Sequence, residues 1–219
     1  MLSVTEENYL KAIYKIAERE GYPVNTNPLA LAMQTTAASV TDMIRRLSDK
    51  QLLHYEKYKG VELTPEGDLL AIHLIRRHRL WEVFLHQTLG FSWDAVHDIA
   101  EELEHIQHPE LTERLDQFLG KPQFDPHGDP IPDAEGQWNS RERMSLAQLA
   151  PDTPAVMAGV ADHSSSFLQY LHQLQLLPGA TLIVRRRVEY DQSVQIMLND
   201  RTEMMLSDKV AHNILVSVQ

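Results

Sequence analysis

The stretch TTAASVTDMIRRLSDKQLLHYEKYKGVELTPEG, residues 35–67, decides the fold of the N-terminal part of this 219-residue chain. It begins with Thr35 or Thr36 as a helix cap, followed by apolar residues at helical spacing: Val40, Met43, Ile44 and Leu47. A short strand, a turn at Lys59–Gly60 and a return strand come next, and Thr64–Pro65 marks the start of another helix. The pattern predicts a helix followed by a β-hairpin.

Two helices precede this stretch. Residues 5–20 place apolar side chains at helical spacing after a Thr5 cap, GYPVNTNP interrupts the helix, and residues 29–33 form a short second one. Three helices and a hairpin in this order are typical of a winged helix-turn-helix, whose third helix enters the major groove of DNA. A small α+β unit that binds no DNA is the alternative.

The exposed start of the third helix carries the candidate base-reading residues, Thr36, Ala38, Ser39 and Asp42. Candidate phosphate contacts on the helix and hairpin are Arg45, Arg46, Lys50, Lys57 and Lys59. The net charge of −11 argues against a nucleic-acid partner, but it is unevenly distributed. Residues 1–60 hold 8 basic and 7 acidic residues, whereas residues 90–150 hold 4 and 13. The acidity therefore lies outside the predicted DNA-binding part.

A second stretch, AVHDIAEELEHIQH at 95–108, combines histidines and carboxylates in a helix-forming segment. On a helix at 100° per residue, one face carries His97, Glu101, Glu104, His105 and His108. On the preceding helix, residues 65–89, His78 and Glu82 also share a face. Imidazole and carboxylate without sulfur suit Mn²⁺, Fe²⁺, Co²⁺ or Zn²⁺. The alternative is two solvated acidic helix faces.

The rest of the chain divides into a loop and a β-rich part. Residues 121–139 are rich in proline, and the C-terminal part alternates Val, Ile and Leu with turns at Pro178–Gly179 and Asn199–Asp200, as expected of a small β-barrel. The chain has no cysteine, which excludes disulfides and thiolate ligands. It shows neither a signal-peptide pattern nor a membrane-spanning run, so we expect a soluble cytoplasmic protein.

Five motifs in order resemble the diphtheria toxin repressor and manganese transport regulator family across residues 5–132. They are TEENYLKAIYKI, SVTDMIRRLSDKQLLHYEKYKGVELTPEG, RRHRLWEVFL, VHDIAEELEHI and DPHGDPIP. The C-terminal part resembles the SH3-like (FeoA-like) domain of the longer members. The resemblance implies a homodimeric repressor that binds Mn²⁺ or Fe²⁺ and then a palindromic DNA operator, controlling metal-homeostasis genes such as those for metal uptake.

The resemblance also implies two metal sites. The primary site would use Asn8, Glu101, Glu104 and His105, and the ancillary site His78, Glu82 and His97. Iron-sensing members have cysteine at the position of Glu101 and manganese sensors have glutamate, which favours Mn²⁺ here. Lys11 stands where the compact manganese sensors place a further glutamate, so we expect no binuclear arrangement.

Two further residues are candidates for the ancillary site. His163 stands where longer members offer a ligand from their extra domain, and is either a ligand or an ordinary surface histidine. Asp125 and Asp129 replace residues that contact an anion in some relatives, so Asp125 could enter the metal shell directly. The core and dimer interface should include Trp81, Phe84, Leu85, Leu103, Ile106, Leu115 and Phe118.

These observations predict a mainly α-helical fold with a small β part, in three domains. Residues 1–72 form the winged helix-turn-helix, 73–140 the helical metal-binding and dimerisation domain with its proline-rich linker, and 141–219 the SH3-like domain. The alternative function is a carboxylate and histidine metalloenzyme of the helical-bundle type. Such bundles repeat their Glu-x-x-His element, and Glu102-x-x-His105 occurs once, so we expect no enzyme.

Overall fold

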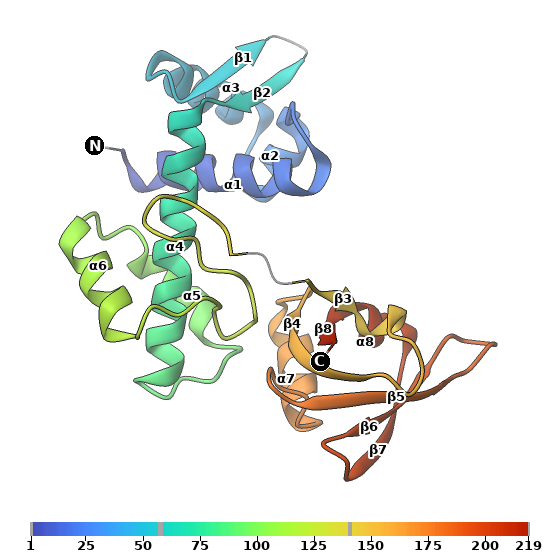
Figure 1. Ribbon diagram of the computed structural model, residues 1–219. Helices are drawn as coiled ribbons and strands as arrows, with labels where there is room; N and C mark the ends of the chain where they lie inside the picture. The colour runs from blue at the N-terminus through green and yellow to red at the C-terminus, as the bar shows by residue number, and fades with distance from the viewer. Residues whose placement is uncertain (1, 57–58, 140–141, 219) are drawn as a thin grey trace. The chain divides into compact units, whose positions relative to one another are not determined.

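The computed structural model describes residues 2–56, 59–139 and 142–218 (Figure 1). The chain forms two compact units, each assembled from separate segments. The first comprises Met1–His78, Glu101–Glu113 and Pro132–Gln137, and the second comprises Arg79–Ala100, Arg114–Ile131 and Trp138–Gln219. Mostly helical N-terminal and middle parts followed by a β-sheet part confirm the predicted fold class. The domain boundaries at 72 and 140 stay predictions.

The first unit contains the predicted winged helix-turn-helix. Its elements are α1 (Val4–Glu20), α2 (Thr26–Ala32), α3 (Ala37–Asp49), β1 (Leu53–Glu56), β2 (Gly60–Leu63) and the beginning of α4 (Pro65–Gln87). The hairpin pairs Leu53 with Leu63 in antiparallel register. Buried residues of α1, α3 and the hairpin, including Ile13, Ile44 and Val61, form one apolar core.

Local capping explains where these helices begin. α1 begins after Ser3 rather than at Thr5, because Ser3 and Glu6 form a reciprocal capping box in which each side chain accepts from the other's backbone N–H. α3 begins after Thr36, whose hydroxyl accepts from the Ser39 N–H. α2 starts earlier than expected and includes Pro28, because proline is tolerated in the first turn of a helix.

The second unit contains the end of α4, the first part of α5 (Val96–Leu103), the last part of α6 (Pro109–Phe118) and the C-terminal sheet. The sheet order is β3 (Met144–Ser145), β8 (Ile214–Val218), β4 (Pro154–Val160), β5 (Thr181–Arg187), β6 (Val194–Leu198) and β7 (Thr202–Leu206). A 3₁₀ turn (Leu146–Gln148) and the helices α7 (Ser165–Gln173) and α8 (Asp208–Asn213) complete it. Asn199 and Asp200 make the expected turn, both at positive φ.

The loop between α6 and β3 lies against β4 within the second unit. The His127 carbonyl accepts from the Val160 N–H, and the Gly128 carbonyl accepts from Arg143. A Cβ built on Gly128 would lie 2.0 Å from the Ala158 carbonyl oxygen and 2.5 Å from the Gly159 Cα. Glycine is therefore required at Gly128, which also has a positive φ of 88°. None of the described helices is long and apolar enough to cross a membrane.

Candidate metal centre

The helix that carries the quoted histidines and carboxylates is shorter than the sequence predicts. α5 ends at Leu103, and Glu104–His108 form a turn and an extended segment before α6. The residue before a proline disfavours helical geometry, and Pro109 follows His108. His108 is exposed and does not share a helical face with Glu101, so that part of the prediction is wrong.

The first unit nevertheless gathers most of the predicted primary ligands in what we call the carboxylate cluster: Glu7, Lys11, His78, Glu101, Glu104 and His105. Asn8 follows Glu7 directly on α1. The Lys11 Nζ lies 2.6 Å from Glu101 Oε1 and 2.9 and 2.7 Å from the two oxygens of Glu104. Glu104 is fully buried, and its Oε2 also accepts from His78 Nδ1 at 2.6 Å. These bonds join α1, α4 and the turn after α5.

His105 is oriented toward the same carboxylates by a residue that sequence reasoning did not single out. Its Nδ1 donates to Glu7 Oε2 at 2.6 Å, which leaves Nε2 3.7 Å from Glu104 Oε1. Glu7 is held in turn by Arg77 and Gln107. A carboxylate that fixes the ring of a ligating histidine is a common second partner at metal sites. Glu7 and Lys11 lie one turn apart on α1, so their common helical face was the available signal.

The donor set of this cluster fits a divalent ion. Glu101 and Glu104 offer carboxylate oxygens, and His105 offers an imidazole nitrogen. The Asn8 Oδ1 is buried and has no hydrogen-bond partner among the residues that the structure describes. Because a buried acceptor without a donor is unfavourable, a cation is a suitable partner for this oxygen. The cluster thus presents oxygen and nitrogen donors without sulfur, the combination suited to borderline and hard divalent ions.

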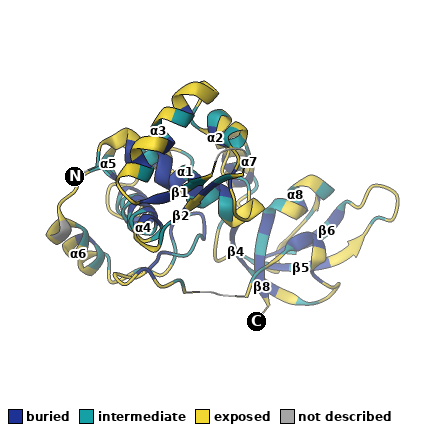
Figure 2. Ribbon diagram, turned by 90° about the horizontal axis from the view of Figure 1, so that it is seen from above, coloured by how far each residue is buried: buried dark blue, intermediate teal, exposed yellow. Residues whose placement is uncertain are grey.

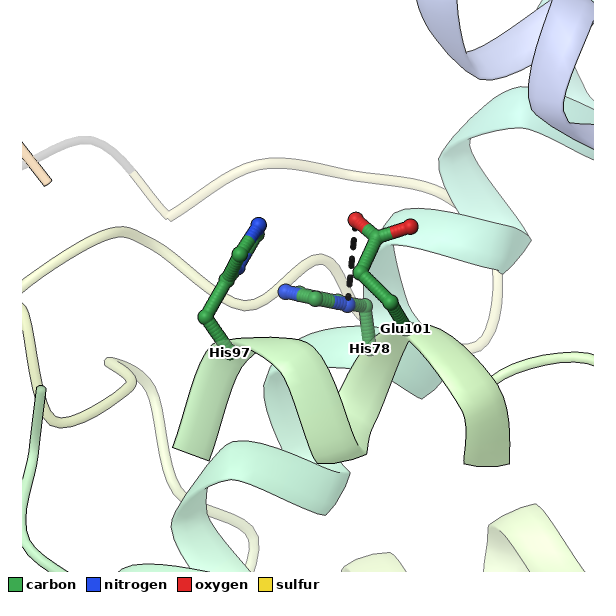
Figure 3. Close-up of side chains that lie close together, drawn as sticks. All are labelled: His78, His97 and Glu101. Carbon is green, nitrogen blue, oxygen red and sulfur yellow. Dashed lines mark ion pairs between the residues drawn. The ribbon is translucent and has the colours of Figure 1, made fainter. Parts of the chain in front are cut away.

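His78 belongs to this cluster through its bond to Glu104 and its ion pair with Glu101, 3.9 Å from Nδ1 to Oε1. Figure 3 draws that pair together with His97, which lies one turn before Glu101 on α5. His78 also precedes Glu82 by one turn of α4. The resemblance assigns His78 to the ancillary set, whereas its hydrogen bond to Glu104 places it in the carboxylate cluster.

The second unit contains what we call the loop cluster: Glu82, His97, Asp125 and His127. The His97 Nδ1 lies 3.4 Å from Glu82 Oε1, and the His127 Nδ1 lies 3.7 Å from Glu82 Oε2. Ligand atoms of Glu82, Asp125 and His127 all lie within 4.8 Å of one another, and all three residues are buried. The predicted Glu82, His97 and Asp125 therefore come together, and His127 joins them. The motif DPHGDPIP contains His127, but its sequence alone gives no direction for the ring.

The orientation of His127 is fixed by its neighbours. Its Nε2 donates to the Trp93 carbonyl at 2.7 Å, and its ring stacks on Trp93, so Nδ1 faces the carboxylates. Burial opposes its charged form, but the bond to Glu82 and the charges of Asp125 and Glu82 outweigh burial and raise the pKa of His127 to about 9. Burial, followed by the charges of Glu82 and Asp129, raises the pKa of Asp125 to about 7.

Asp129 and His163 lie beside the loop cluster. The His163 Nε2 is 3.7 Å from Asp129 Oδ2, and its ring meets the His127 ring edge-on at 5.2 Å. Arg79 pairs with both Asp125 and Asp129, at 3.6 and 3.2 Å. The two aspartates thus have their own cationic partner. His163 is placed near the candidate ligands, and its role as one of them stays a prediction.

The candidate DNA-reading residues are exposed. Thr36, Ala38, Ser39 and Asp42 lie at the start of α3, which Figure 2 shows with an exposed surface. Arg45, Arg46, Lys50 and Lys59 are also exposed. Lys50 pairs with Glu6, Lys59 with Glu56, and Arg45 with Asp42, so phosphates would compete with these partners. Lys57 lies outside the described residues.

A winged helix-turn-helix together with buried carboxylate and histidine clusters defines a metal-dependent DNA-binding protein. Three family models match: "Iron dependent repressor, N-terminal DNA binding domain" at residues 1–61, "Iron dependent repressor, metal binding and dimerisation domain" at 64–133, and "FeoA domain" at 144–218. The "Iron-dependent repressor IdeR" of Mycobacterium tuberculosis is 33% identical, covering 97% of this chain and 96% of the relative. The "Diphtheria toxin repressor" of Corynebacterium glutamicum is 28% identical, with 97% and 95% coverage.

Solved structures agree with this assignment. One described as "Manganese-dependent transcriptional repressor complex with manganese" has a TM-score of 0.84 and 33% identity, covering 98% of this chain and 100% of the other. The manganese regulator SloR has a TM-score of 0.72 and 31% identity, with 98% coverage of both chains. The chain belongs to the iron-dependent repressor family and is a metal-dependent DNA-binding transcriptional repressor. Because this family consists of repressors, the metalloenzyme alternative is not retained.

The raised pKa of Asp125 predicts how the stability of the metal-free protein depends on pH. A chelator is present throughout the measurement to keep the protein free of metal. A raised carboxyl pKa means that folded Asp125 holds a proton that the unfolded chain has released, so the contribution of Asp125 to stability should fall as the pH rises from 3.8 to about 7. Asp125→Asn keeps an acceptor for the backbone N–H groups of His127 and Asp129 and removes the charge. We expect this variant to flatten that slope in urea unfolding.

Asp125→Ala serves as the comparison. It removes the charge but also leaves two backbone N–H groups without their acceptor, so it should lose about 1–3 kcal/mol at every pH. If Asp125→Asn keeps the parent's pH slope, Asp125 is not the group that produces it.

Proposed function

We propose that this repressor is activated preferentially by Mn²⁺, with Fe²⁺ as the second choice, and acts in the cytoplasm as a homodimer on a palindromic operator. It would repress genes of metal-ion homeostasis, such as those for metal uptake. The carboxylate cluster is the single observation that supports this proposal most. It includes α1, which packs against the DNA-reading part of the chain, so an ion bound there acts on the same helix.

The role we assign to the ion is thermodynamic. An ion that binds Asn8 on α1 together with Glu101, Glu104 and His105 stabilises the arrangement of α1 that brings these donors together. Any ligand shifts a conformational equilibrium by its difference in affinity for the two states. The favoured state would be the one in which the two α3 helices of a dimer match half-sites about one turn of DNA apart.

The loop cluster is the second site in this proposal. Glu82, His97, Asp125 and His127 would hold the ion, with His163 adjoining. Both ring geometry and charge support the assignment, because His127 directs Nδ1 at two buried carboxylates. An ion there replaces the proton shared between acidic and imidazole groups, since metal ligands must be deprotonated.

Manganese is preferred because both sites lack a soft donor. A thiolate favours Fe²⁺ or Co²⁺ relative to Mn²⁺, whereas carboxylate and amide oxygens suit Mn²⁺. The similar solved structure that is described as a complex with manganese supports the same choice.

The dimer face we propose lies in the second unit. Phe118 is 67% exposed and packs against Phe84, with ring centroids 6.1 Å apart, and Phe84 contacts Trp81. Leu89 and Phe91 are further exposed apolar residues of this unit. An exposed aromatic side chain packed on a buried apolar core, as Phe118 is through Phe84, is typical of an association surface. Leu85 and Leu115 are buried, as expected, whereas Ile106 is exposed.

The activating site is tested by Glu104→Gln, which keeps the size of the side chain and removes its charge. We expect Mn²⁺-stimulated DNA binding to fall by at least about a hundredfold, because a carboxylate ligand of the ion is lost. The measurement is a fluorescence-anisotropy titration of the variant on operator DNA selected from genomic fragments, with and without Mn²⁺. Glu102→Gln, an exposed neighbour on α5, is the matched control and should respond like the parent. A parental metal response in Glu104→Gln would refute the site.

Metal preference is tested by Glu101→Cys. A thiolate at this position should shift the order of activation from Mn²⁺ toward Fe²⁺ and Co²⁺, because it adds a soft ligand. The same DNA titration is repeated with Mn²⁺, Co²⁺ and, anaerobically, Fe²⁺. An unchanged order of the three ions would show that Glu101 does not contact the activating metal.

Dimerisation is tested by Phe118→Glu. Sedimentation of the Mn²⁺-loaded parent at micromolar concentration should give a dimer, and the variant should sediment as a 25.1 kDa monomer because a charge is placed in the apolar face. Tyr190→Glu, which changes a 98% exposed residue in the turn between β5 and β6, is the control and should stay dimeric. A parent protein that is monomeric with metal would contradict the proposal.

A further inference from the structure

Lys11 occupies the centre of the carboxylate cluster. Its side chain is 6% exposed, and its ammonium lies at 2.6–2.9 Å from three oxygens of Glu101 and Glu104. An ammonium has three N–H donors, so these contacts use its full donor capacity. Buried lysine is uncommon unless it is paired. The resemblance aligns Lys11 with a glutamate of the compact manganese sensors, and the structure shows its ammonium at Glu101 and Glu104, 90 and 93 positions away.

We propose that the Lys11 ammonium is a built-in competitor for the metal ion. It neutralises Glu101 and Glu104 in the metal-free protein and must withdraw before a divalent ion takes up the same oxygens. Lys11 thereby sets the ion concentration at which the repressor is activated. This inference rests on the proposed function, because it takes the carboxylate cluster as the activating site.

Charge supports the competition. Glu7, Glu101 and Glu104 carry three negative charges, and Lys11 and Arg77 carry two positive charges within hydrogen-bond distance of them. The cluster is therefore close to neutral before any ion binds. A divalent ion at bonding distance from Glu101 and Glu104 would lie within about 5 Å of the ammonium if Lys11 stayed in place. Repulsion at this distance in a buried site is strong, so the two cations exclude one another.

Geometry supports an exchange between two residues of α1. Asn8 lies three positions before Lys11, close to one turn of the helix, and its Oδ1 is the buried acceptor without a partner. In the structure described here, α1 is held to Glu101 and Glu104 through Lys11. With an ion bound, the same carboxylates would hold α1 through the ion and Asn8. The residue through which α1 is attached to the carboxylates would thus change from Lys11 to Asn8, a shift of almost one helical turn.

The test compares Lys11→Met, which keeps the length of the side chain and removes the charge, with the parent. Binding of Mn²⁺ alone is measured by isothermal titration calorimetry on full-length protein, and thermal unfolding is measured with a chelator and with Mn²⁺. We expect the affinity for Mn²⁺ at the carboxylate cluster to rise at least about tenfold. The melting temperature should fall without metal, and the increase on adding Mn²⁺ should be larger than in the parent.

Two control variants show whether a higher Mn²⁺ affinity of Lys11→Met comes from loss of the Lys11 charge or from a general effect of removing a lysine. Lys50→Met removes a lysine that pairs with Glu6 at 2.6 Å outside the cluster, and its affinity for Mn²⁺ should equal that of the parent. Lys11→Arg keeps the positive charge, so its affinity should stay near the parental value or below it. A rise in Lys50→Met or Lys11→Arg equal to that in Lys11→Met would overturn the inference.

The remaining outcomes are also decisive. If Lys11→Met binds Mn²⁺ no more tightly than the parent, Lys11 does not compete with the ion. If Lys11→Met fails to fold with the chelator, Mn²⁺ is titrated into it while helical circular dichroism is followed. Recovery of the parental signal supports the inference, and no recovery refutes it. Calorimetry of Glu104→Gln tests the proposed function separately from the role of Lys11. If Glu104→Gln binds Mn²⁺ like the parent, the carboxylate cluster is not the activating site; if it loses the Mn²⁺ signal, the site stands and the Lys11 variants decide the competition.

Discussion

The buried carboxylate of Glu104 is the constraint on which the rest of the helical part depends. Its side chain has no exposed area, and a charge in that position is strongly unfavourable unless it is paired and hydrogen-bonded. Lys11 from α1 and His78 from α4 provide the partners, and Arg77 donates to the Glu104 backbone carbonyl. One charged residue thus holds two helices that are distant in sequence. Whatever binds Glu104 also acts on the position of α1.

The two clusters balance buried negative charge by different means. In the carboxylate cluster, a lysine supplies the positive charge, and in the loop cluster a proton is held by Asp125 and His127. In our proposal, a metal ion displaces the Lys11 side chain from the first cluster and protons from the second. The proposal therefore makes ion binding at the loop cluster depend on solution pH, because metal ligands must be deprotonated.

Sequence reasoning predicted the elements better than the contacts between them. The apolar spacing of Val40, Ile44 and Leu47 identified α3, because each of these side chains faces one core. The helical face at 95–108 was partly wrong, since α5 ends at Leu103 and the backbone turns before Pro109. Even so, Glu104 and His105 reach the carboxylate cluster from that turn, and their role as metal ligands stays a prediction.

The contacts that sequence reasoning missed share a physical cause. Glu7 acts through His105, and Lys11 through Glu101 and Glu104, at separations of 98, 90 and 93 residues. Periodicity shows which side of a helix is buried, but it does not show which distant residue meets that side. His127 is a similar case, because its ring direction is fixed by the backbone carbonyl of Trp93. Such partners become visible only when the chain is folded.

The close approach of Gly128 to β4 has a consequence for how this architecture can change in evolution. The loop that carries Asp125 and His127 lies on β4 at Ala158, Gly159 and Val160, with no room for a side chain at Gly128. A C-terminal module acquired from another protein would need a strand with no side chain facing Gly128. It would also need a backbone N–H group that can donate to the His127 carbonyl. Recombination of the C-terminal module is therefore restricted to sequences that preserve this surface. The C-terminal module is thus tied by shape to the loop that carries Asp125 and His127.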